Sequence, residues 1–304
     1  MGEAQTLHRT PSPAARAAAA PLPVRAPAGA PRLVFLGTGG GAHAERCHVA
    51  IAIEVGPRRV LLLDTAGGFE LLRQLKLAGI ELSAVRHIFL SHRHSDHIGG
   101  LEPLLLHIGL QAMRARCRGR DVSVYGHAVV LEAARTIIDA MASAAPTFLA
   151  KVDARLRWNA LGAGATVDLW PGVRLTTFAA DHVPADGTAF GCVVEVARAG
   201  HRQRIVYSGD TRPTPELRAA ARGADILLHE AGGIDEDAEL MHVAGHSSAG
   251  EAARLAAEAG VGCLVLCHLP HEEIVPQLIA EARRYYEGPV IVPRDLDTLP
   301  LTSA

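Results

Sequence analysis

The chain has 304 residues, 49% of them hydrophobic and 20% charged, so it is long enough to bury a sizeable core in one large domain or two ordinary ones. A formal net charge of −2 argues against nonspecific binding to long polyanions or membrane surfaces, although not against a small anionic substrate. The five cysteines are odd in number and lack compact spacing, so they do not predict a disulfide framework.

Residues 1–31 are rich in Ala, Pro and Arg and lack the continuous apolar stretch of a secretory signal. We therefore expect a disordered tail here, with an organelle transit segment as the alternative, and one folded domain over residues 32–304. No stretch approaches the roughly 20 apolar residues of a membrane span. We accordingly expect a cytoplasmic protein that does not bind membranes.

Short apolar strands and amphipathic helices alternate along the predicted domain. Strands are predicted at Arg32–Leu36, Ala50–Val55, Arg59–Asp64, Val85–Leu90, Val122–Tyr125, Val173–Phe178, Phe190–Val196, Arg204–Tyr207, Ile226–Leu228, Cys263–Cys267 and Val290–Val292. Helices are predicted at Phe69–Leu77, Leu101–Arg114, Ala128–Met141, Ser248–Glu258 and Ile274–Tyr285. Strand pairs mixed with strand–helix units predict stacked sheets covered by helices, whose functional residues gather in loops beyond strand ends.

A histidine-rich run, SHRHSDHIGG, begins at Ser91 directly after a predicted strand. It is predicted to be a loop. Clustered His and Asp side chains are costly to assemble, and a bound metal ion removes that cost. In an extended loop, residues two apart point the same way, so His92 and His94 can reach one ion. Asp96 and His97 are adjacent and favour opposite directions, so they need not serve that ion, and the run suggests two metal sites.

Three further strand ends each deliver a His or an Asp. His182 follows the strand that ends at Phe178, Asp210 follows the one that ends at Tyr207, and His268 follows the one that ends at Cys267. Imidazole and carboxylate ligands suit zinc, and also manganese or iron. These residues together predict a metal centre.

This set of residues resembles the metallo-β-lactamase fold hydrolases over about residues 32–293. The family pattern H-x-H-x-D-H, followed by a distant His, Asp and His, is matched residue by residue. The resemblance implies an α/β fold, the four-layer αβ/βα sandwich, with two zinc ions at one edge of its sheets. It assigns His92, His94 and His182 to one ion, Asp96, His97 and His268 to the other, and Asp210 to both as a bridge.

Secondary motifs are similar to those of the ribonuclease Z branch. Phe35–Gly39 matches its opening strand and loop, and Tyr207–Arg212 matches its Asp motif. His229-Glu230-Ala231-Gly232 resembles its His-Glu-Ala-Thr motif, and His246-Ser247-Ser248 resembles its His-Ser-Thr motif. The resemblance implies that His246 stabilises phosphoryl oxygens or protonates the leaving oxygen, with Glu230 orienting it.

Simpler interpretations of these secondary residues stay open. His246-Ser247-Ser248 precedes a predicted helix that either serine could cap, and Glu230 could be a surface carboxylate. Gly37–Gly41 is more typical of a tight turn under the metal site than of a phosphate cradle. The arginines at alternate positions from 114 to 120 could steer an anionic substrate, but a solvated helix end is the favoured interpretation.

One departure from the ribonuclease Z pattern concerns substrate. That branch carries a long tRNA-binding arm between its third-motif His and the bridging Asp, whereas only 28 positions separate His182 from Asp210 here. A strand pair is predicted to fill them. The missing arm counts against tRNA 3′-end processing and favours smaller phosphodiesters.

We therefore predict a dinuclear zinc phosphodiesterase that acts on a small phosphodiester or an RNA end. The nucleophile would be a hydroxide that bridges the metals, with Asp96 as both a ligand and the residue that orients this hydroxide. The alternatives are a hydrolase of sulfate esters, carboxylic esters or lactones on the same metals, an iron-dependent oxidoreductase, and a catalytically silent scaffold. Glu230 and His246 count against the oxidoreductase, and the intact ligand set counts against the scaffold. Members of the family are often homodimers, so the resemblance also implies that state.

Overall fold

The computed structural model describes residues 31–198 and 200–301. The predicted N-terminal tail, apart from its last residue, lies outside these described residues, so the boundary between tail and domain stays a prediction. Among the described residues, no helix combines the length and the apolar character needed to cross a membrane.

The first sheet comes mainly from the N-terminal half of the chain. Its strands are β1 (Arg32–Gly37), β2 (Ala50–Gly56), β3 (Arg59–Leu63), β4 (Val85–Phe89), β5 (Val122–Gly126), β6 (Leu156–Ala160) and β14 (Thr298–Pro300). Within the described ranges they form a seven-stranded sheet in the order β14-β1-β2-β3-β4-β5-β6. Neighbours from β14 to β3 are antiparallel, and those from β3 to β6 are parallel.

The second sheet comes from the C-terminal half. Its strands are β7 (Thr166–Trp170), β8 (Val173–Ala179), β9 (Phe190–Arg198), β10 (His201–Tyr207), β11 (Ile226–Glu230), β12 (Leu264–Cys267) and β13 (Val290–Ile291). In the part of the chain that the structure describes, their order is β13-β12-β11-β10-β9-β8-β7. The strands from β7 to β10 are antiparallel neighbours, and those from β10 to β13 are parallel.

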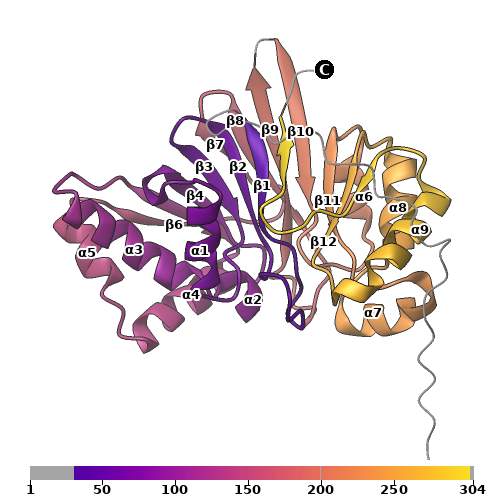
Figure 1. Cartoon of the computed structure of the whole chain (residues 1–304), viewed down its shortest axis with the longest axis horizontal. Coiled ribbons are helices and arrows are strands. Elements are labelled where there is room, and N and C mark those ends of the chain that lie inside the picture. The colour runs from indigo at the N-terminus through magenta and orange to yellow at the C-terminus, as the bar shows by residue number, and fades with distance from the viewer. Residues whose placement is uncertain (1–30, 199, 302–304) are drawn as a thin grey trace, which may run out of the picture.

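Helices cover the outer face of each sheet (Figure 1). Beside the first sheet lie α1 (Glu70–Leu77), α3 (Leu101–Arg114), α4 (Ala128–Ala140) and α5 (Ala145–Lys151), and beside the second lie α6 (Pro215–Ala221), α8 (Ala249–Ala259) and α9 (Val275–Tyr285). Two short helices, α2 (Ser95–Ile98) and α7 (Ala238–Ala244), lie at the lower edge in this view. The predicted four-layer αβ/βα sandwich is therefore confirmed.

The apolar residues explain this layering, because side chains alternate across each strand. On β1, Leu33 and Phe35 pack between the two sheets, whereas Val34 and Leu36 pack toward the helices. A third apolar layer joins the second sheet to α6, α8 and α9. Both sheets are thus buried on two faces, and loops at the strand ends are left to carry polar chemistry.

Most predicted elements are present, with ends shifted by a few residues, but the histidine run is not a plain loop. It is extended only as far as His94 and then forms α2. The sequence analysis did not predict α5 and α6, which bury two residues each, nor β6, β7, α7 and β14. β6 and β7 are largely half-exposed, α7 buries none of its residues, and β14 is three residues long. Weak apolar periodicity hides such elements from sequence patterns.

Candidate metal centre

The predicted ligands meet at one edge of the two sheets. The run from His92 follows β4, His182 follows β8, Asp210 follows β10 and His268 follows β12. Because these strands end at the same edge, their loops converge there, and the space among their His and Asp side chains is called the cleft below. All of the predicted ligands take part in groups of His and acidic side chains whose ligand atoms lie within 4.8 Å of one another.

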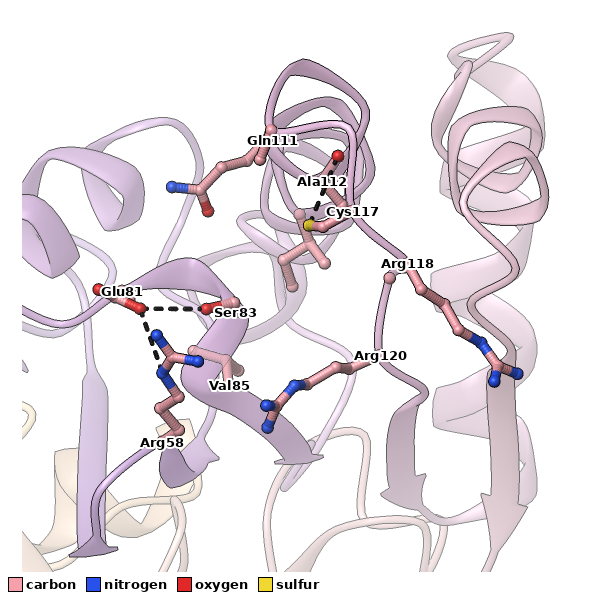
Figure 2. A pocket seen from close by; sticks show the side chains of 12 residues that line it. Arg58, Glu81, Ser83, Val85, Gln111, Ala112, Cys117, Arg118 and Arg120 are labelled. Atoms are coloured by element: carbon pink, nitrogen blue, oxygen red, sulfur yellow. Dashed lines mark hydrogen bonds and ion pairs between the residues drawn. The ribbon is translucent and has the colours of Figure 1, made fainter.

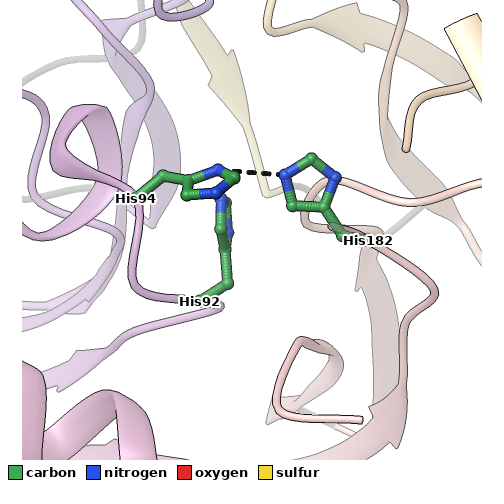
Figure 3. Close-up of side chains that lie close together, drawn as sticks. All are labelled: His92, His94 and His182. Atoms are coloured by element: carbon green, nitrogen blue, oxygen red, sulfur yellow. Dashed lines mark hydrogen bonds between the residues drawn. The ribbon is translucent and has the colours of Figure 1, made fainter. Parts of the chain in front are cut away.

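The first group contains His92, His94 and His182 (Figure 3). The Nε2 atom of His182 lies 3.0 Å from Nδ1 of His94, so the two rings face each other across the cleft. His92 approaches from below in this view and is almost fully buried. Its pKa is lowered far below the usual value by burial and by neighbouring His97, so it is a neutral imidazole, the form that ligates metals.

The second group contains Asp96, His97 and His268. Oδ2 of Asp96 lies 3.4 Å from Nε2 of His97 and 3.4 Å from Nε2 of His268. The short helix α2 makes this possible, because adjacent helical residues project about 100° apart rather than to opposite sides. His97 also forms a group with His92 and Asp210, so the division of the run between two ions stays a prediction.

Asp210 lies between the two groups and is buried. Its Oδ2 atom is 3.1 Å from Nε2 of His268, 3.3 Å from that of His97, 3.7 Å from that of His92 and 3.8 Å from that of His182. Burial opposes ionisation, but the surrounding imidazoles, His268 foremost, hold the pKa of this carboxyl well below its usual range. One ionised oxygen therefore faces imidazoles of both groups, as a bridging ligand would.

Asp64, which the sequence analysis did not select, orients His97 from behind. Oδ2 of Asp64 lies 2.8 Å from Nδ1 of His97 and accepts the hydroxyl of Tyr207 at 2.6 Å. The amide and hydroxyl of Ser91 also donate to this carboxylate, both at 2.7 Å. A carboxylate in this position fixes the ring so that Nε2 faces the cleft. The signal was present, because Asp64 is a polar residue at a strand end like Asp210.

Two histidines of the first group are oriented by similar contacts. Nδ1 of His92 lies 3.0 Å from the hydroxyl of Ser91, and Nδ1 of His182 lies 2.8 Å from the carbonyl oxygen of Gly245. In each case the outer ring nitrogen has a partner inside the protein. The inner Nε2 atom is thereby left for a cation in the cleft.

Three buried polar atoms show that these residues fit a metal ion. Among the described residues, no hydrogen-bond partner reaches Nε2 of His92, Nε2 of His97 or Oδ1 of Asp210. Buried polar atoms are rarely left without a partner. Burial lowers the pKa of His97, but Asp210 and Asp64 outweigh it and raise that pKa well above the usual value, so the cleft attracts positive charge. Divalent cations bound among these side chains would satisfy the three atoms.

Glu230 is buried, with 1% of its surface exposed, so its interpretation as a surface carboxylate is wrong. Its Oε1 atom accepts the amides of Thr211 at 3.0 Å and Ser247 at 3.2 Å, and it lies 3.0 Å from Nδ1 of His246. Oε2 accepts the amide of Gly232 at 3.2 Å. A carboxylate held by three backbone amides is a rigid support for the imidazole beside it.

His246 lies against the candidate ligands. Its ring stacks on that of His268, with centroids 5.2 Å apart, and is tilted against that of His182 at 4.9 Å. Burial lowers the pKa of His246, but the Glu230 carboxylate outweighs it and raises that pKa to about 9. The capping role falls to Ser248, whose side chain and that of Glu251 form a capping box at the start of α8. His246 is therefore not needed as a cap.

The glycine loop after β1 passes directly against the centre. A Cβ at Gly40 would lie 2.8 Å from Cε1 of His268, and one at Gly41 would lie 3.1 Å from Oδ2 of Asp96. Glycine is used here for close backbone approach to the candidate ligands. The structure thus favours the turn beneath the metal site.

A family model described as a beta-lactamase superfamily domain matches residues 58–269. Ribonuclease Z of Myxococcus xanthus is 30% identical over 311 aligned residues, which cover 89% of this chain and 97% of that protein. Ribonuclease Z of Archaeoglobus fulgidus is 27% identical, with 86% of this chain and 94% of that protein covered.

Solved structures show the same fold. The metallo-beta-lactamase fold protein YhfI from Bacillus subtilis superposes with a TM-score of 0.69 at 23% identity, covering 88% of this chain and 98% of that one. The short form of human tRNase Z superposes with a TM-score of 0.67 at 20% identity, covering 90% of this chain and 100% of that one. Because the family model spans most of the sequence and a 30% identical relative aligns along nearly all of it, the chain belongs to the beta-lactamase superfamily and is a metal-dependent hydrolase.

Proposed function

We propose that the protein is a dinuclear zinc phosphodiesterase acting on small phosphodiesters or RNA ends. The observation that carries the proposal is the position of Asp210, whose Oδ2 atom lies within 3.8 Å of Nε2 atoms from both histidine groups. Four imidazoles around one carboxylate oxygen fit two cations that share a ligand. A centre rich in imidazole suits zinc, with manganese or iron as the alternatives.

The proposal divides the metal ligands between two of the groups of neighbouring side chains. His92, His94 and His182 would hold one ion, Asp96, His97 and His268 would hold the other, and Asp210 would bridge them. When bound, the two ions supply an activated water at neutral pH and a clamp for phosphoryl oxygens. The carboxylate of Asp96, which reaches the cleft from α2, orients that water through its oxygen atoms.

His246 is proposed to act on the phosphoryl group. Its Nδ1 atom is held 3.0 Å from Glu230, so Nε2 is the atom left to donate a hydrogen bond or a proton. The ring lies over His268 and beside His182, against one candidate ligand from each group. Glu230 acts by positioning His246.

Two observations support a small substrate or an accessible RNA end over a folded tRNA. The described residues between His182 and Asp210 form one loop and the hairpin of β9 and β10, whose strands pair along their length within the second sheet. The alignment with the M. xanthus ribonuclease Z covers 311 positions but only 89% of this 304-residue chain, so about 40 of its positions have no counterpart here.

The test is a substrate panel on zinc-reconstituted protein: bis(p-nitrophenyl) phosphate, cyclic nucleotides, a precursor tRNA, and aryl sulfates and esters. We expect hydrolysis of the phosphodiesters and slow or no cleavage of precursor tRNA. Activity confined to sulfate or carboxylic esters at saturating metal would show that the proposal is wrong. Light scattering on the same sample tests the homodimer that the ribonuclease Z resemblance implies.

A further inference from the structure

A pocket lies at the end of the first sheet opposite the candidate metal centre. Its volume is about 390 Å³, which falls in the range of roughly 300–1,000 Å³ typical of small-molecule sites. Its walls are the turn between β2 and β3, the 3₁₀ turn Leu82–Ala84, the start of β4 and the last turns of α3 with the loop that follows. The pocket shares no residue with the candidate metal groups.

The polar wall of this pocket has an excess of positive charge (Figure 2). Arg120 extends toward Val85 and Arg58, whereas Arg118 points away and pairs with Asp153 at 2.7 Å. Glu81 is the one carboxylate of the described lining, and it lies 3.8 Å from Arg58. No described carboxylate lies within ion-pair distance of Arg120. Arg120 belongs to the most arginine-dense segment of the chain.

A further guanidinium lies next to Arg120. Nε of Arg86 donates to the carbonyl oxygen of Asp121 at 2.7 Å, and burial together with the Arg120 charge lowers the pKa of Arg86. The carboxylate of Asp121, which pairs with Arg157 at 2.8 Å, raises the pKa of Arg86 but does not outweigh burial and the Arg120 charge. An anion bound in the pocket beside Arg120 would reduce this repulsion.

The floor of the pocket is apolar. Val85 and Ile108 are 1% and 6% exposed, and half-buried Ala112 lies one turn along α3 from Ile108. An inorganic anion would leave this floor in contact with water, and a neutral apolar molecule would leave Arg120 without a counter-charge. A ligand that has both an apolar body and an anionic head satisfies the whole lining.

We propose that this pocket is a binding site for a small organic anion with an apolar ring or short chain. The head group lies between Arg58 and Arg120, and the apolar body lies on Val85, Ile108 and Ala112. An RNA backbone could use the arginines but would leave the concave apolar floor empty, so the small anion is the occupant that the lining favours. Val85 begins the strand whose far end leads to His92, so this ligand does not touch the metal centre.

The experiment compares two fluorescent probes that share a ring system. 8-Anilinonaphthalene-1-sulfonate carries an anionic sulfonate, and N-phenyl-1-naphthylamine lacks it. Titrated into the full chain, the sulfonate is expected to bind at least fivefold more tightly than the amine. Arg120→Gln is expected to weaken sulfonate binding about tenfold and leave amine binding unchanged, since it removes one charged contact. Ala112→Phe fills the pocket and is expected to weaken both probes.

The matched control is Arg114→Gln, because Arg114 belongs to the same basic run but does not line the pocket. It is expected to bind both probes as the unchanged protein does. Equal losses in Arg114→Gln and Arg120→Gln, or unchanged sulfonate binding in Arg120→Gln, would overturn the proposal. So would displacement of the sulfonate by oligouridylate at lower concentration than by 1-naphthoate, which would assign the site to RNA. Thermal unfolding confirms that each variant is folded.

Discussion

The two halves of the molecule supply the candidate metal centre in different ways. The N-terminal half contributes His92, His94, Asp96 and His97 from one loop and the short helix α2, within six residues. The C-terminal half contributes single residues after three separate strands. A contiguous run can be recognised locally, whereas scattered residues acquire meaning only when the second sheet brings their strands to one edge. The centre therefore depends on docking of the two sheets.

Two buried carboxylates contact residues of the opposite half. Asp210, from the second half, faces His92 and His97 of the first. Asp64, from the first half, accepts the hydroxyl of Tyr207 on β10 of the second. Each half thus places one buried carboxylate against the other's residues, which ties the geometry of the centre to the packing between the sheets.

The largest expected effect comes from Asp210→Ala, which tests whether both halves share one centre. Because Oδ2 faces imidazoles of both groups, we expect bound zinc to fall from about two ions to below one per chain and phosphodiester hydrolysis to fall about 1,000-fold or more. Metal analysis measures the bound zinc, and steady-state kinetics measure the rate of hydrolysis. Asp181→Ala is the control, since Asp181 lies beside ligand His182 but pairs with Arg212. Retention of two ions by Asp210→Ala would contradict the bridging role.

A second prediction separates binding from turnover within the C-terminal half. His246→Ala is expected to keep both zinc ions and lose about 100- to 10,000-fold in kcat, the range typical of a general acid. Glu230→Gln should lower kcat less, because the amide oxygen of glutamine can still accept a hydrogen bond from Nδ1 of His246, although it lacks the negative charge. Normal turnover by His246→Ala would remove the catalytic role assigned to it.

The third prediction concerns the N-terminal half, where Asp64 supports His97 from behind. Asp64→Asn is expected to weaken zinc binding about 10- to 100-fold, as measured by competition with a chelator. Tyr207→Phe keeps the contact between the carboxylate and His97 and should cost less. If Asp64→Asn binds zinc as tightly as the unchanged protein, the orientation of His97 does not depend on this carboxylate.

The contrast between the contiguous histidine run and the single residues at separate strand ends explains what the sequence could predict. The layered fold follows from strong apolar alternation, and the strand-end rule led to His182, Asp210 and His268. Asp64 was counted as the last residue of its strand, although its positive φ of 56° already turns the chain out of it. The support of Glu230 by three backbone amides could not be predicted, because those amides come from separate segments. The assignment of each ligand to an ion stays a prediction.

The smallest expected effect comes from Ser248→Ala. Ser248 and His246 belong to one sequence motif of the C-terminal half, but we expect them to have different roles. Ser248 caps α8 by accepting the amide of Glu251 at 3.0 Å, whereas His246 faces the candidate ligands. Ser248→Ala is expected to lower the free energy of unfolding by about 1–2 kcal/mol in urea titrations, with kcat nearly unchanged. Thr214→Ala, which removes the cap of α6, should cost a similar amount. A loss of kcat in Ser248→Ala as large as that in His246→Ala would show that capping and catalysis are not separable at these positions.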